Sequence, residues 1–178
     1  MKKILWVAAL WALPSMAEAC DGPARGWVAD LGLHVIAGGY QQRLGCHAVL
    51  QGSVGLYVPW TVNDNVLGLG VEGRSGDIAG AMLRVRAFWY PFGEAPSGLW
   101  VSPFAQVGVV QGSRAITRYG SAAALGVAAG YTFRLGARWL LAAGAGPQFH
   151  RASVGGSTES PGFSRLGLHV DLNVVYRF

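Results

Sequence analysis

The final stretch of the chain, residues 165–178, reads RLGLHVDLNVVYRF and alternates between two kinds of side chain. Counting back from Phe178, every second residue is aromatic or aliphatic. The charged, imidazole and amide side chains fall between them, namely Arg165, His169, Asp171, Asn173 and Arg177. Successive side chains of a β-strand point to opposite faces, so this stretch predicts a strand with one apolar face and one polar face. Tyr176 and Phe178 place aromatic rings at the end of the apolar face.

The chain begins with a segment that has the composition of a secretory signal peptide. Lys2 and Lys3 precede an apolar segment at 4–13, and Ala-Glu-Ala at 17–19 matches an A-x-A cleavage site. The apolar segment is too short to span a bilayer as a helix. We therefore expect a signal peptide at 1–19 and an exported domain at 20–178. A lipoprotein is the alternative, because Cys20 would be the first mature residue, but Glu18 does not fit the usual small-residue pattern before a lipidated cysteine.

The composition is rich in apolar residues and poor in charges. Hydrophobic residues make up 52% and charged residues 13%, against about 25% charged in soluble domains. After the signal peptide no segment has the ~18 uncharged apolar residues that a transmembrane helix needs. Both lysines lie in the signal peptide, so the exported domain relies on arginine, which suits buried ion pairs and phosphate. Because the charge is dispersed and the chain is exported, we expect no nucleic-acid binding.

The same alternation recurs along the exported domain, and it is clearest at 81–90. There Leu83 and Val85 would point to one face, and Arg84 and Arg86 to the other. We expect strands at 27–37, 46–58, 66–74, 81–90, 99–110, 121–134 and 138–150, and an eighth that ends at 178. A soluble β-sandwich also alternates, but here the polar face carries charges in the middle of strands and the apolar face ends in aromatic residues. Those features favour a membrane barrel with its apolar face outward.

Eight strands form the smallest common membrane barrel, and an even number places both termini on the periplasmic side. Segments 59–65, 92–98 and 135–137 would then be periplasmic turns. Segments 38–45, 75–80, 111–120 and 151–162 would be external loops. In this topology Cys20 and Cys46 lie at opposite ends of the barrel, so we expect no disulfide between them.

These features resemble the small eight-stranded outer-membrane barrels of Gram-negative bacteria, OmpA-like in the broad sense, over nearly the whole exported chain. The segment AFWYPFGEAPSGLWVSPFAQVG, within 84–108, is also similar to a family of uncharacterised outer-membrane β-barrel proteins. That family shares an aromatic-Phe-Gly turn followed by Gly-aromatic-x-x-Pro. The terminal Phe178, with Tyr176, resembles the recognition signal for the barrel-assembly machinery. The resemblance implies a fold and a location but no activity, because one barrel serves anchors, adhesins, pores and lipid A enzymes.

The charges expected inside the barrel need partners, because an eight-stranded barrel is only wide enough for side chains. The expected lumen charge network comprises Asp30, Glu72, Arg84, Arg86, Arg165 and Asp171. A structural network that plugs the lumen is the simpler interpretation, and a proton or ion path is the alternative. The inward positions expected on 121–134 and 138–150 are small, whereas those on 81–90 and 99–110 are large. This contrast predicts large-against-small packing, with a pocket for an acyl chain or other small apolar ligand as the alternative.

All four histidines fall in the expected inward register, on strands that become contiguous when the barrel closes. They are His34, His47, His150 and His169. Such a cluster could bind a transition metal or act as a pH-sensitive gate, although histidine is equally acceptable as an ordinary lumen residue. We predict no cofactor. Arginines in the expected external loops could contact lipopolysaccharide phosphates, and these are Arg43, Arg114, Arg118 and Arg151.

A lipid A deacylase is the main catalytic alternative. Deacylases that resemble this barrel class use a His-x-Ser pair with a distant acid, and a nucleophile and base must lie within hydrogen-bond reach. Here His150 and Ser153 have a different spacing, and Glu159 falls in an expected loop. The sequence therefore predicts an all-β, eight-stranded antiparallel up-and-down transmembrane β-barrel. We expect a non-catalytic outer-membrane monomer with a structural or surface-interaction role, in contact with outer-membrane lipid, lipopolysaccharide and the barrel-assembly machinery.

Overall fold

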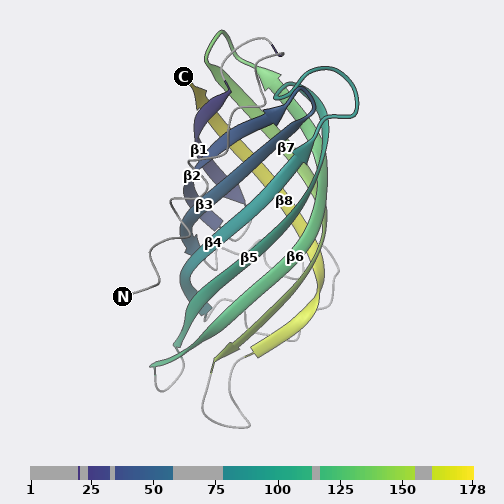
Figure 1. Cartoon of the computed structure of the whole chain (residues 1–178). Helices are drawn as coiled ribbons and strands as arrows, with labels where there is room; N and C mark the ends of the chain where they lie inside the picture. Colours follow the sequence, from purple (N-terminus) through teal and green to yellow (C-terminus); the bar gives the residue numbers. More distant parts are fainter. Residues whose placement is uncertain (1–19, 21–23, 33–34, 58–77, 114–116, 155–161) are drawn as a thin grey trace, which may run out of the picture.

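In the computed structural model of the chain, the period-two alternation of the sequence becomes strands that form a closed antiparallel barrel (Figure 1). The structure describes residues 20, 24–32, 35–57, 78–113, 117–154 and 162–178. Its strands are β1 (Arg25–Gly32), β2 (Val35–Gly45), β3 (Ala48–Tyr57), β4 (Ile78–Trp89), β5 (Gly98–Ser113), β6 (Thr117–Arg134), β7 (Trp139–Val154) and β8 (Gly162–Arg177). Each strand pairs with its neighbours in chain order, and β1 pairs with β8. The expected all-β, eight-stranded antiparallel up-and-down barrel is confirmed.

Burial alternates along the strands as the sequence indicates. On β4, Arg84 and Arg86 are buried in the barrel, whereas Leu83, Val85 and Trp89 are exposed on its outer face. The same alternation runs through β5 and through β8, where the polar register faces inward. The outer face is therefore apolar and the interior is mixed, which is the reverse of a soluble sandwich.

The start of β1, the end of β8 and three turns lie at one end of the barrel, which we call the terminal end. The turns are at 46–47, 90–97 and 135–138. The backbone N–H of Phe178 donates to the carbonyl oxygen of Arg25 at 3.1 Å, so the last residue extends the β1–β8 pairing. Figure 1 shows the C-terminus at this end, at the top of the view. We call the opposite end the far end.

The expected bounds of the first strands are wrong. Residues 27–37 form parts of two strands, because β1 ends at Gly32 and pairs there with Val35, the first residue of β2. Val35 is consequently buried rather than outward. Residues 38–45, expected as an external loop, belong to β2 and return to the terminal end. The sequence between the two strands, Leu33-His34, contains no glycine, proline, asparagine or aspartate to indicate a turn.

Other expected boundaries shift or cannot be compared. The expected strand at 66–74, the expected turn at 59–65 and the signal peptide at 1–19 lie outside the described residues. β5, β6 and β7 extend further toward the far end than expected, which takes up much of the expected loops at 111–120 and 151–162. Within the described ranges, no helix is long and apolar enough to cross a membrane.

Candidate functional site

The barrel interior holds two arginines in succession on the inward face of β4, and it is the candidate site of the molecule. Arg84 and Arg86 are 2% and 1% exposed. Removing a guanidinium from water costs several kcal/mol unless a negative charge and hydrogen-bond acceptors replace the water. The arrangement around each arginine supplies both.

Arg84 is paired with Asp30 of β1. Its Nη1 atom lies 3.0 Å from Oδ1 and 3.1 Å from Oδ2 of Asp30. The Nε and Nη2 atoms of Arg84 donate to the side-chain oxygen of Gln106 at 3.2 and 2.9 Å. Ser53 of β3 donates a further hydrogen bond to Asp30 at 2.9 Å. The guanidinium of Arg84 on β4 therefore bonds directly to Asp30 on β1 and Gln106 on β5, and the Asp30 carboxylate connects it to Ser53 on β3.

Arg86 is paired with Asp171 of β8. The Nη1 atom of Arg86 donates to Asp171 Oδ2, and its Nε atom donates to Ser102 Oγ at 3.2 Å. Aromatic rings complete the surroundings: the guanidinium carbon lies 4.5 Å from the ring centre of Phe88 and 5.6 Å from that of Trp100. Aromatic faces attract a cation more strongly when water is excluded, so the rings and the carboxylate together hold the charge in place.

Further polar groups extend this layer across the barrel. Gln51 of β3 donates to the side-chain oxygen of Asn173 of β8 at 3.1 Å. His169 lies between Phe104 and Asp171, with a ring-centre distance of 4.4 Å to Phe104 and an Nε2–Oδ1 distance of 3.9 Å to Asp171. We call the groups of these contacts the lumen network: Asp30, Gln51, Ser53, Arg84, Arg86, Ser102, Gln106, His169, Asp171 and Asn173.

Large rings on β5 fill the interior against glycines on β6 and β7, as the sequence predicts. A Cβ atom placed on Gly130 would lie 2.5 Å from the indole ring of Trp100, and one on Gly126 would lie 2.5 Å from the ring of Phe104. Trp100 also covers Gly144. Gly126 and Gly144 are required by the close approach of the rings, and Gly130 by the rings and by the backbone of β7.

At the terminal end, a disulfide joins Cys20 to the turn at 46–47. The topology expected from the sequence excluded this bond. Cys20 and Cys46 are bonded, with Cα atoms 5.4 Å apart. They meet because β2 returns to the terminal end, which places the turn at 46–47 beside Cys20. A Cys20 thiol in a disulfide cannot carry a lipid anchor at the same time, so this bond also disfavours the lipoprotein alternative.

Arg43 also holds Cys20 against the terminal end of the barrel. It was expected in an external loop facing lipopolysaccharide, but it lies at the terminal end and is 2% exposed. It donates to the carbonyl oxygens of Cys20 at 2.7 Å and Ala95 at 3.3 Å. Of the other arginines expected to meet lipopolysaccharide, Arg151 is exposed near the far end. The placement of Arg114 and the side chain of Arg118 lie outside what the structure describes.

The structure places His47 and His150 toward opposite ends of the barrel. His47 lies in the turn at the terminal end, exposed, with Nδ1 3.1 Å from the carbonyl oxygen of Tyr90. His150 is on β7 toward the far end, where its backbone pairs with Ala124 and Arg165. His169 belongs to the lumen network. His34 and the side chain of His150 lie outside the description, and the described residues contain no group of three metal-ligating side chains.

The remaining expected residues divide between the described and undescribed parts. Of the expected lumen charges, Asp30, Arg84, Arg86 and Asp171 form the two ion pairs, whereas Glu72 and the side chain of Arg165 are not described. Phe178 lies 6.0 Å from Trp27 between ring centres, and Tyr176 lies 5.0 Å from Trp139. The expected catalytic alternative rests on the side chains of His150, Ser153 and Glu159, none of which is described.

Sequence reasoning missed the neutral members of the lumen network. Gln51 and Ser53 alternate on β3, and Ser102 and Gln106 on β5, so their inward register was visible in the sequence. Which of them would meet which charge depends on strand register, which the sequence does not specify. Chemically, the network fixes charges in pairs and leaves no described carboxylate of the interior without a cationic partner.

Comparisons of the chain with protein-family models, with curated proteins and with solved structures gave no match.

Proposed function

We propose that this chain is an integral outer-membrane β-barrel whose role is structural or in surface interaction, without catalytic activity, and that both termini are periplasmic. The observation that carries the proposal is the outer face. Large apolar side chains are exposed there on all eight strands. Such a surface is far larger than the apolar patches that monomeric soluble proteins expose, whereas hydrocarbon would match it.

An aromatic row at the terminal end supports this location. Trp139, Tyr176, Trp27 and Tyr40 are successive neighbours on β7, β8, β1 and β2. Aromatic residues with one polar atom favour the boundary between hydrocarbon and headgroups. On β6, Tyr131 near the terminal end and Tyr119 near the far end are both exposed. At ~3.3 Å per residue and a tilt of ~40°, they are about 30 Å apart along the barrel axis, which matches a hydrocarbon core.

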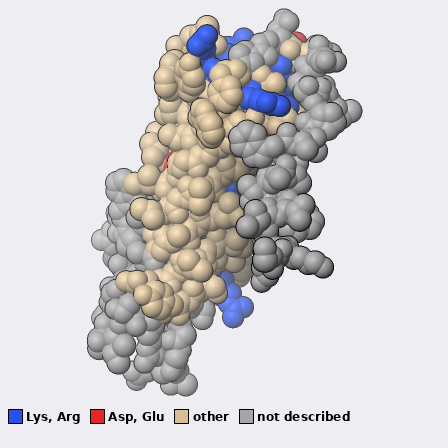
Figure 2. Space-filling view, turned by 60° about the vertical axis from the view of Figure 1, so that its left-hand side comes forward, with Lys and Arg blue, Asp and Glu red and all other residues tan. Residues whose placement is uncertain are grey.

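The charge distribution agrees with the same placement. Figure 2 shows arginine atoms gathered at the terminal end, above a side of the barrel that is almost entirely free of charged atoms. The arginines described at that end are Arg25, Arg43, Arg134, Arg138 and Arg177. Arginine beside lipid headgroups can bind phosphate bidentately. The export expected from residues 1–19, and the resemblance of Tyr176 and Phe178 to the recognition signal for the barrel-assembly machinery, are consistent with this proposal.

The lumen network favours a structural barrel over a pore. The two ion pairs and the rings of Phe88, Trp100 and Phe104 occupy the interior. A water-filled channel of the porin kind needs many more strands than eight. We therefore propose that the barrel is plugged and acts through its outer face.

A pair of leucine substitutions tests the membrane location. Leu125 in the middle of β6 and Leu135 in a terminal-end turn are 63% and 60% exposed. In water, Leu125→Arg and Leu135→Arg would both be nearly neutral. In a bilayer, only Leu125→Arg places a cation in hydrocarbon, and we expect it to lower the free energy of unfolding by about 2–4 kcal/mol.

The measurement is urea unfolding of protein refolded into lipid vesicles, together with the heat-modifiable gel mobility of the folded barrel. Fractionation of expressing cells gives the location directly. Equal stabilities of the two variants, or a protein that stays in the soluble periplasmic fraction, would overturn the proposal.

A further inference from the structure

Two glycines leave the outer surface bare at one place on the barrel. Gly38 of β2 and Gly52 of β3 both lie in the outward register, and a Cβ atom added to either would meet nothing within 4 Å. Gly38 pairs with Val54, and Gly52 pairs with Tyr40. The two bare positions are therefore diagonal neighbours, and together they interrupt the layer of side chains that covers the rest of these strands.

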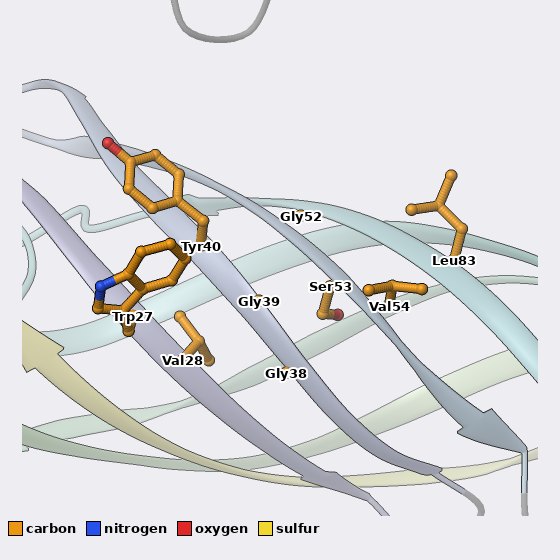
Figure 3. Close-up of a pocket in the computed structure, with 9 residues that line it drawn as sticks. All are labelled: Trp27, Val28, Gly38, Gly39, Tyr40, Gly52, Ser53, Val54 and Leu83. Atoms are coloured by element: carbon orange, nitrogen blue, oxygen red, sulfur yellow. The ribbon is translucent and has the colours of Figure 1, made fainter. Parts of the chain in front are cut away.

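The bare backbone forms the floor of a groove with a volume of about 540 Å³. Figure 3 shows its two sides: Trp27 and Tyr40 stand on one side, and Val54 and Leu83 on the other. The volume lies within the range of small-molecule sites, ~300–1,000 Å³. Apart from the indole nitrogen and the phenol oxygen, the side chains that form these walls are apolar.

The groove is apolar at one end and polar at the other. In Figure 3 the indole nitrogen of Trp27 and the hydroxyl of Tyr40 lie on the side away from Val54 and Leu83, which is the side toward the terminal end. Arg25, exposed and two residues before Trp27 in the same outward register, comes next toward that end. Apolar wall, amphipathic rings and cation thus follow one another in a line. A membrane lipid has its acyl chain, ester region and phosphate in the same order.

We propose that this groove holds one acyl chain of a membrane glycerophospholipid whose phosphate lies against Arg25. The proposal rests on the proposed membrane location and names a ligand for the outer face. A flexible acyl chain suits a narrow groove, because the missing Cβ atoms of Gly38 and Gly52 let it approach the backbone. The guanidinium of Arg25 complements the phosphate charge. A second copy of the chain is the competing occupant, and the test distinguishes it.

Filling the groove tests the acyl-chain contact. In Gly52→Leu the new side chain would occupy the groove. Gly45→Leu is the matched control, because Gly45 also has nothing within 4 Å of an added Cβ but does not line the groove. Native mass spectrometry of the detergent-purified chain, with phosphatidylglycerol added, measures the lipid retained. We expect Gly52→Leu to retain about tenfold less lipid than wild type and Gly45→Leu to match wild type.

Two variants that each remove one positive charge test the phosphate contact. Arg25→Gln and Arg138→Gln remove the same charge from the same end, but Arg138 donates to Tyr176 on β8 rather than lying beside the groove. We expect Arg25→Gln alone to lower the preference for phosphatidylglycerol over zwitterionic phosphatidylcholine, by about fivefold. An equal effect of both variants would overturn the assignment of the phosphate to Arg25.

Equal lipid retention by Gly52→Leu and Gly45→Leu would overturn the groove proposal. Loss of a dimer in Gly52→Leu without loss of lipid would overturn it too, and would assign the groove to contact between copies. Should Gly52→Leu lack the gel mobility of the folded barrel, Gly38→Leu repeats the test from β2. The membrane location is tested separately by Leu125→Arg, whose position on β6 is remote from the groove.

Discussion

Removing the charge of Asp30 should destabilise the barrel through the arginine that it leaves behind. Asp30 and Arg84 are 0% and 2% exposed, and both carboxylate oxygens accept from Arg84 Nη1. Asp30→Asn keeps the shape of the side chain but leaves a buried guanidinium without its negative partner. Breaking a buried pair in this way costs about 3–5 kcal/mol. Because Gln106 still accepts from Arg84, we expect a loss near the lower limit, about 3 kcal/mol.

A double variant separates the charge effect from the loss of packing. Arg84→Met removes the cation and keeps most of its volume, so Asp30→Asn with Arg84→Met contains neither buried charge. We expect the double variant to lose about 2 kcal/mol less than the sum of the two single variants, a coupling of the size found between contacting residues. Ser53→Ala, which removes one neutral donor to Asp30, should cost only about 1 kcal/mol.

The assay is urea unfolding in phospholipid vesicles, followed by tryptophan emission. Retained gel mobility of the folded barrel shows that each variant starts from the native state. Strictly additive losses in the cycle would refute the reasoning, because they would mean that Asp30 and Arg84 do not interact energetically. The reasoning would be refuted more directly if the Asp30→Asn variant unfolded at the same urea concentration as the wild-type protein.

Three further predictions concern the filled interior and its closure. Gly130→Val should lower the free energy of unfolding by about 1–3 kcal/mol, because its Cβ would meet the backbone of Ala143 on β7 as well as the ring of Trp100. Gly52→Val on the open outer face should be nearly neutral in urea titrations. Cys46→Ser should lose about 3 kcal/mol, the loop-closure contribution expected for a separation of 26 residues. It should also abolish the mobility difference between reduced and non-reduced samples, and a persisting difference would argue against the Cys20–Cys46 bond. In planar bilayers the wild-type protein should give no stepwise conductance, since the lumen network fills the interior, and stable channels would contradict a plugged barrel.

The strands that the sequence predicts best are those whose two faces differ most in chemistry. On β4, Arg84 and Arg86 alternate with Leu83 and Val85, so only one register is possible. At the start of β2, Val35, Ile36 and Ala37 are all apolar, and the pattern does not reveal that the register has changed between Leu31 and Val35. Because no turn-forming residue lies between β1 and β2, the sequence pattern predicts one strand where the structure has two.

That single boundary explains the errors in the candidate site. The expected topology assigned residues 38–45 of β2 to a loop. It therefore placed Arg43, Cys46 and His47 at the opposite end of the barrel from the one where the structure has them. The Cys20–Cys46 bond, the burial of Arg43 and the separation of His47 from His150 all follow once β2 returns to the terminal end. The expected ion partners on β1, β4 and β8 were less affected, because Asp30, Arg84 and Asp171 do not belong to β2.

The arrangement of the lumen network restricts where a ligand can bind. Arg84 ties β4 to β1 and β5, Arg86 ties β4 to β5 and β8, and the Gln51–Asn173 hydrogen bond joins β3 to β8. A ligand entering the interior would have to separate at least one buried ion pair, and each separation leaves an uncompensated charge at a cost of several kcal/mol. The groove at Gly38 and Gly52 requires no such separation, since its floor is already bare. Recognition by this barrel is therefore expected on the outer face, with the interior holding the strands in the geometry that presents it.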